Sequence, residues 1–123
     1  MCVLLVEDED LIRMVLSDVM TDVGFKVIEA ANAESALALA ETTPRPDAIV
    51  SDIDLGPGMD GFALAATLRR RWPTVPVLMM SGRAANFAGR QSGKAERFLS
   101  KPFLLDAFVQ HVVDMVRKPK AAS

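Results

Sequence analysis

Five short apolar runs alternate along this chain with longer segments of helical periodicity, and no other feature constrains the fold as strongly. The runs at residues 2–6, 48–51 and 77–80 are apolar at nearly every successive position, which is typical of strands buried on both faces. Two further strands are expected at 26–30 and 97–100. Strands that alternate with helices favour a parallel sheet covered on both sides. The sequence therefore predicts an α/β fold built on a five-stranded parallel sheet.

Five helices are expected around this sheet. In the first, apolar residues recur at helical spacing from Leu11 to Val23, with Asp10 placed as its N-cap and Gly24 just past its end. The other four are expected at 33–41, 62–71, 82–96 and 104–117. The helix at 82–96 is the weakest of these, because glycines inside it lower its helix propensity.

Composition limits the possible partners and the compartment. The chain has 123 residues, of which 50% are hydrophobic, and this suits one domain with a real core. A net charge of -2 argues against direct nucleic acid binding, because proteins that hold phosphate backbones are usually basic. A single cysteine, Cys2, excludes an internal disulfide. No apolar run reaches membrane-spanning length, and Glu7 interrupts the N-terminal run too early for a signal peptide. These features predict a cytoplasmic domain with no membrane contact.

Polar residues follow four of the predicted strands directly. They are Glu7, Asp8, Glu9 and Asp10 after the first strand, Asp52 and Asp54 after the third, Ser81 after the fourth, and Lys101 with Pro102 after the fifth. The carboxyl ends of parallel strands meet at one edge of the sheet, where ligands of such folds bind. Several carboxylates, a hydroxyl and an ammonium group are therefore expected close together.

These residue types suit one chemistry. Clustered carboxylates with no histidine or cysteine nearby are typical ligands of Mg²⁺, which neutralises their repulsion. A lysine and a hydroxyl facing that metal would bind the oxygens of a phosphoryl group. Asp52, at the centre, can act as the nucleophile that receives this group.

Short motifs at these positions resemble the receiver domain of two-component response regulators, along essentially the whole chain. They are Val-Glu-Asp-Glu after the first strand, Ser-Asp-Ile after the third, Met-Asp-Gly at the third helix, Met-Ser-Gly at the fourth strand and Phe-Leu-Ser-Lys-Pro-Phe at the fifth. The resemblance implies a flavodoxin-like fold with strand order 2-1-3-4-5 and five helices on both faces. Residues 1–118 would form the receiver domain and 119–123 a short polar tail.

The resemblance also implies roles for individual residues. Asp52 would be the phosphoacceptor, Ser81 would donate its hydroxyl to a phosphoryl oxygen, and Lys101 would pair with the phosphoryl group. Lys101-Pro102 would be a cis peptide bond. Phe98 would turn inward as Ser81 moves, although a plain core position explains this phenylalanine equally well.

Mg²⁺ is the cofactor that the resemblance implies. Asp8 and Asp52 would bind it, Glu7 would bind it directly or through water, and Asp54 would contribute its backbone carbonyl. Glu7 stands where the family often has aspartate, and the loop from Asp52 to Gly61 is one residue longer than usual. The side chains of Asp54 and Arg83, two residues beyond Asp52 and Ser81, are expected to tune the lifetime of the phosphoryl group.

The implied function is signalling rather than enzymatic turnover. A histidine kinase or phosphotransfer protein would phosphorylate Asp52, and the domain would then control a downstream protein through the face formed by 82–96, 97–100 and 104–117. Phosphorylation could also drive homodimer formation. The chain starts directly before its first strand and ends after its last helix, so no output domain is expected.

Three alternatives compete with this interpretation. A receiver excised from a hybrid histidine kinase would have the same sequence features. A haloacid-dehalogenase-type phosphatase would share Asp52, Asp54, Ser81 and Lys101, but its acidic metal pair should follow the lysine, and Leu55 replaces an expected threonine or valine. A flavin-binding module lacks support, because acids after the first strand would repel a phosphate.

Overall fold

The computed structural model describes residues 1–83, 87 and 96–117, and in this part of the chain five parallel strands form one sheet. The strand order is β2-β1-β3-β4-β5, as the resemblance implied. The strands are β1 (Cys2–Val6), β2 (Lys26–Ala30), β3 (Ala48–Asp52), β4 (Val77–Ser81) and β5 (Glu96–Ser100). All residues of β3 and β4 are buried, including the polar Ser51, Asp52 and Ser81 at their carboxyl ends.

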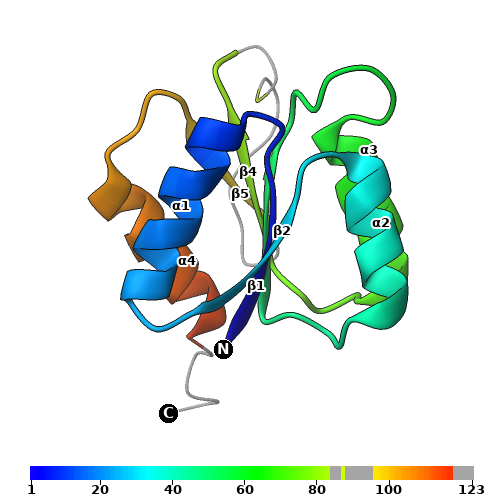
Figure 1. The fold of residues 1–123 in the computed structure, drawn as a ribbon, viewed down its shortest axis with the longest axis horizontal. Coiled ribbons are helices and arrows are strands. Elements are labelled where there is room, and N and C mark those ends of the chain that lie inside the picture. Colours follow the sequence, from blue (N-terminus) through cyan, green and yellow to red (C-terminus); the bar gives the residue numbers. More distant parts are fainter. Residues whose placement is uncertain (84–86, 88–95, 118–123) are drawn as a thin grey trace.

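Four helices are described, two on each face of the sheet (Figure 1). They are α1 (Asp10–Asp22), α2 (Ala33–Thr42), α3 (Gly61–Arg71) and α4 (Leu105–Val116). Helices α1 and α4 cover one face, and α2 and α3 cover the other. The helix expected at 82–96 falls mostly outside the described residues, as does the tail at 119–123.

The helix ends show one error in the sequence prediction. Asp10 is not the N-cap of α1 but its first helical residue, and Glu9 holds the cap position without a side-chain capping bond. The Asp10 carboxylate instead contacts the Arg13 guanidinium at 2.6 Å, one turn along the helix. Gly24 does lie just past α1, with a φ of 99° that favours glycine.

Two apolar clusters stabilise the fold, one on each side of the sheet. Side chains of β1, β3 and β4 alternate between them, so that Leu4 faces the α2–α3 side while Leu5 faces the α1–α4 side. Trp72, at the end of α3, is buried in the first cluster. No described helix combines the length and apolar character needed to cross a bilayer. This packing leaves the carboxyl ends of β1, β3 and β4 side by side.

Candidate functional site

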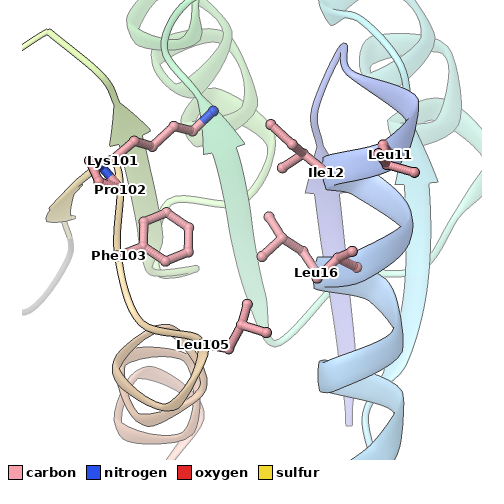
Figure 2. A pocket seen from close by; sticks show the side chains of 8 residues that line it. Leu11, Ile12, Leu16, Lys101, Pro102, Phe103 and Leu105 are labelled. Carbon is pink, nitrogen blue, oxygen red and sulfur yellow. The ribbon is translucent and has the colours of Figure 1, made fainter.

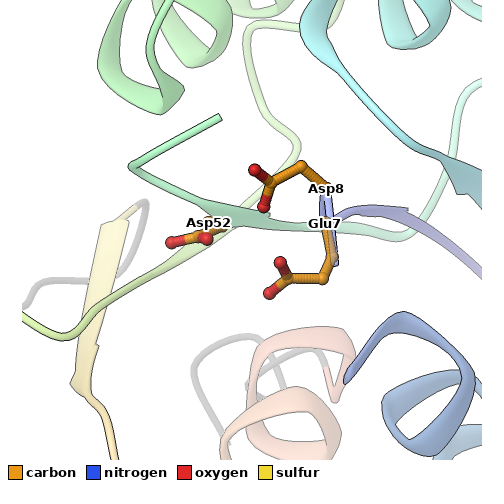
Figure 3. Close-up of side chains that lie close together, drawn as sticks. All are labelled: Glu7, Asp8 and Asp52. Carbon is orange, nitrogen blue, oxygen red and sulfur yellow. The ribbon is translucent and has the colours of Figure 1, made fainter. Parts of the chain in front are cut away.

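Three carboxylates meet at this edge of the sheet (Figure 3). Glu7 and Asp8 follow β1, and Asp52 is the last residue of β3. One oxygen atom from each carboxylate lies within 4.8 Å of the other two. Glu7 and Asp52 are buried, whereas Asp8 is exposed. Glu9 and Asp10, which the sequence placed in the same group of acids, lie outside this cluster.

Lys101 joins two of these carboxylates. Its Nζ lies 3.1 Å from Glu7 Oε1 and 3.3 Å from Asp52 Oδ2. The Lys101 backbone N–H donates to the Ser81 carbonyl at 2.8 Å, which fixes the loop after β5 to the end of β4. The Lys101-Pro102 peptide bond is cis, as expected. Residues at the carboxyl ends of β1, β3, β4 and β5 therefore do lie close together, as the sequence predicts.

Burial controls the protonation of the cluster. It raises the pKa of Glu7 to about 7, with the charge of Asp52 adding to the rise, while the Glu9 N–H and Lys101 oppose it. Burial also raises the pKa of Asp52, against the opposing effect of Lys101. Burial alone would lower the pKa of Lys101, but the charges of Glu7 and Asp52 raise it. Near neutral pH a proton thus competes with a cation for Glu7.

The donor set of the cluster fits Mg²⁺. All three candidate ligands are carboxylates from two adjacent strands, and such oxygen ligands suit a hard cation. Exposure of Asp8 leaves room for the water molecules that Mg²⁺ retains. Asp54 approaches through its backbone N–H, which lies 3.4 Å from Asp52 Oδ1, and the metal-binding role of its carbonyl stays a prediction.

Ser81 is fully buried beside the cluster. Its Oγ lies 3.4 Å from Asp54 Oδ2 and accepts a hydrogen bond from the Arg83 N–H at 3.0 Å. Arg83 therefore contacts Ser81 through its backbone, and its side chain is exposed. The tuning roles of the Asp54 and Arg83 side chains stay predictions.

Phe98 lies on β5, and its ring is half-buried. It contacts the ring of Phe87, with the ring centres 5.2 Å apart, and packs against the apolar cluster under α2 and α3. This position is compatible with both readings of Phe98, as a core residue and as a switch.

Two residues that the sequence analysis did not select support the site. A Cβ on Gly61 would collide with the Asp52 backbone carbonyl, and the Gly61 N–H donates to the Ile53 carbonyl at 2.8 Å. Arg13 Nη1 donates to the Glu7 carbonyl at 2.8 Å. For Arg13 a sequence signal existed, because a basic residue three positions after an acid at a helix start can pair with it.

An apolar groove of about 490 Å³ opens beside Lys101, between α1 and the segment that leads into α4 (Figure 2). It is lined by Leu11, Ile12, Val15, Leu16, Lys101, Pro102, Phe103 and Leu105. Leu11 is 70% exposed, and Val15 and Leu105 are also exposed. The groove thus places apolar surface directly next to the lysine that contacts Asp52.

Comparisons with known proteins agree with this arrangement. The family described as the response regulator receiver domain matches residues 3–113. Transcriptional regulatory protein TcrA of Mycobacterium tuberculosis is 39% identical over 107 residues, which cover 85% of this chain and 41% of TcrA. Sensor kinase CckA of Brucella abortus is 38% identical over 119 residues, which cover 94% of this chain and 12% of CckA. The chain therefore spans less than half the length of either relative.

Solved structures show the same similarity over whole domains. The receiver domain of the hybrid histidine kinase CckA superposes with a TM-score of 0.80 and 31% identity, over 95% of this chain and 100% of that one. The chemotaxis response regulator CheY4 of Vibrio cholerae gives a TM-score of 0.76 and 28% identity, over 93% and 97%. With its fold, its edge cluster and its family match in agreement, this chain belongs to the response regulator receiver domain family.

Proposed function

We propose that this domain is a phosphoacceptor: with Mg²⁺ bound, Asp52 accepts a phosphoryl group from the phosphohistidine of a histidine kinase or phosphotransfer protein. The observation that carries this proposal is the convergence of Glu7, Asp8 and Lys101 on Asp52 at the carboxyl edge of the sheet. We place this exchange in the cytoplasm. The domain would assist only its own phosphorylation and dephosphorylation and would turn over no separate substrate.

The chemistry follows from the charges around Asp52. An oxygen of its carboxylate attacks phosphorus, the bond from phosphorus to the donor nitrogen breaks, and the imidazole leaves with that electron pair. Mg²⁺, held by Glu7, Asp8 and Asp52, would supply positive charge to the phosphoryl oxygens. Lys101 Nζ, already 3.3 Å from Asp52, is close enough to pair with an oxygen of the transferred group.

Phosphorylation would then change the surroundings of Ser81. Its hydroxyl lies near Asp54 in this structure, and a phosphoryl oxygen on Asp52 would compete for that hydroxyl. A shift of Ser81 would also displace β5, because β5 pairs with β4 and carries Phe98. We propose that a downstream protein, or a second copy of this chain, reads the change on the face that includes β5 and α4; most of the segment 82–96, which the sequence assigned to the same face, lies outside the described residues.

The phosphodonor protein would dock on the apolar groove next to Lys101. Transfer requires the donor histidine to enter the site, and the groove extends from Lys101 along α1. Exposed Leu11 and Leu105 give this surface apolar character that water solvates poorly. A helical donor surface with apolar residues around its histidine would bury these side chains and leave the histidine facing Asp52.

A kinase-attached receiver is the second candidate, because 94% of this chain aligns with a small part of Sensor kinase CckA. The chemistry at Asp52 would be the same, and only the source of the phosphoryl group would differ. A haloacid-dehalogenase-type phosphatase is disfavoured by the family match and by Glu7 and Asp8, which precede Asp52 in sequence and complete its cluster.

The decisive experiment is incubation with a small phosphodonor such as phosphoramidate, with and without Mg²⁺, followed by mass spectrometry of the intact protein. We expect one added phosphoryl group, stable to acid and labile to base, only with Mg²⁺. Asp52→Asn should remain unmodified, and Asp18→Asn, which changes an exposed acid on α1, should be modified like wild type. Equal labelling of Asp52→Asn would remove the proposed function.

A further inference from the structure

The guanidinium of Arg13 lies at the junction of three elements. Nη1 donates to the Glu7 backbone carbonyl at 2.8 Å, Nη2 contacts Asp10 Oδ1 at 2.6 Å, and Nε lies 3.5 Å from Glu29 Oε1. These partners belong to the end of β1, the first turn of α1 and strand β2. The Arg13 side chain is only 18% exposed, whereas that of Asp10 is 88% exposed, so the bond to the Glu7 carbonyl is the shielded contact and the pair with Asp10 is a surface ion pair.

The contact with the Glu7 carbonyl bears directly on Asp8. The carbonyl of Glu7 and the N–H of Asp8 belong to one planar peptide unit, so fixing the first fixes the orientation of the second. The other side of Glu7 is also held, because its N–H donates to the Ala30 carbonyl at 3.1 Å. With both ends of Glu7 fixed, the Asp8 backbone leaves β1 in one direction.

Asp8 needs such a constraint more than its neighbours do. Glu7 and Asp52 are buried, and each contacts Lys101, whereas Asp8 is exposed and follows the end of the strand. An exposed carboxylate on an unconstrained loop would lose conformational entropy when it binds a cation. Hydrogen bonds that orient the ligands of a metal usually limit that loss.

We propose that Arg13 is a positioning residue for the Mg²⁺ site: its guanidinium holds the Glu7–Asp8 peptide so that the Asp8 carboxylate faces Asp52. This inference rests on the proposed Mg²⁺ site and adds a residue that does not touch the metal. This role requires the planar guanidinium with its several donors, because it contacts three acceptors that lie in different directions. A lysine would keep the charge and lose that geometry.

The sign of the effect separates positioning from simple electrostatics. A cation near an acidic cluster repels Mg²⁺, so removing the charge of Arg13 would by itself tighten Mg²⁺ binding. Loss of positioning would weaken it instead, typically by about tenfold or more for a residue behind the ligands. Arg45→Ala is a matched control, because Arg45 bonds Thr74 before β3 and β4, at the opposite edge of the sheet.

The test measures Mg²⁺ affinity by isothermal titration calorimetry for wild type, Arg13→Ala, Arg13→Lys and Arg45→Ala. We expect binding at least about tenfold weaker in both Arg13 variants and unchanged in Arg45→Ala. Phosphorylation by phosphoramidate should reach the wild-type rate in the Arg13 variants once Mg²⁺ is saturating. Equal or tighter binding by Arg13→Ala would overturn the proposal, and so would wild-type affinity in Arg13→Lys.

A metal-free measurement keeps this inference distinct from the proposed function. In the presence of a chelator, ¹⁵N relaxation of the Asp8 amide should show greater fast motion in Arg13→Lys than in wild type, with equal melting temperatures showing that both are folded. An Asp8 amide as rigid in the variant as in wild type would refute positioning. Failure of wild type to bind Mg²⁺ would instead refute the metal site.

Discussion

Glu7 should make the metal-free domain less stable as pH rises from about 4.5 to about 7. The pKa of Glu7 rises from 4.5 to about 7 on folding. At about 1.4 kcal/mol per pH unit, ionising this buried carboxyl in the folded state costs roughly 3 kcal/mol. The folded state binds a proton between these values that the unfolded chain has released, so stability falls across this range. Below about pH 4.5 the penalty is absent, and above about pH 7 it is complete.

The perturbation that tests this reasoning is Glu7→Gln, measured by urea unfolding in chelator at intervals from pH 4.5 to pH 8. Glutamine has nearly the same shape as glutamate and cannot ionise. The free energy of unfolding of the variant should therefore increase relative to that of wild type as pH rises. This gain in the free energy of unfolding has an upper limit of roughly 3 kcal/mol, because the neutral glutamine cannot form the ion pair that ionised Glu7 makes with Lys101. Added Mg²⁺ at pH 8 should stabilise wild type more than the variant.

Glu9→Gln is the control, because Glu9 is exposed and only its backbone N–H contacts Glu7. It should follow the wild-type pH profile. If the stabilities of wild type and Glu7→Gln run parallel from pH 4.5 to pH 8, the Glu7 carboxyl does not carry the pKa that its burial implies.

Three further outcomes are expected. Gly61→Ala should lower the free energy of unfolding by about 1–3 kcal/mol, since the added Cβ would collide with the Asp52 carbonyl. The control Gly82→Ala, whose Cβ would meet open space, should have a melting temperature close to that of wild type. Leu11→Asp should slow phosphorylation by a donor protein and leave the reaction with phosphoramidate unchanged, and equal slowing of both would exclude the groove as a docking surface. Alanine at Asp54 or Arg83 should change the rate at which the phosphorylated domain loses phosphate, and identical rates in both variants would remove these side chains from the mechanism.

The fold was predictable because its signals are local in the sequence. An apolar run such as residues 77–80 of β4 and a glycine at a helix end such as Gly24 are specified within a few residues. The carboxyl ends of parallel strands meet by geometry alone, so the convergence of Asp52 and Lys101 followed once the strands were identified.

Side-chain direction was not predictable in the same way. Asp10 has the residue type of an N-cap, but it lies one position inside α1, where its carboxylate contacts a guanidinium. Helical side chains point back toward the N-terminus, and this brings Arg13 to the carbonyl of Glu7. The groove beside Lys101 depends on how α1 and the segment before α4 lie in space, and no sequence pattern encodes that spacing.

The sheet separates two apolar clusters, one under α1 and α4 and the other under α2 and α3. The apolar groove beside Lys101 is formed by side chains of the α1–α4 side, including Leu16 and Phe103, whereas the ring of Phe98 packs on the α2–α3 side. Strands β1, β3 and β4 contribute side chains to both clusters. A donor protein bound over α1 would therefore leave the Phe98 side of the sheet uncovered. The proposed output face shares α4 with this groove, since Leu105 lines it, so a bound donor would compete only with a downstream protein that contacts this end of α4.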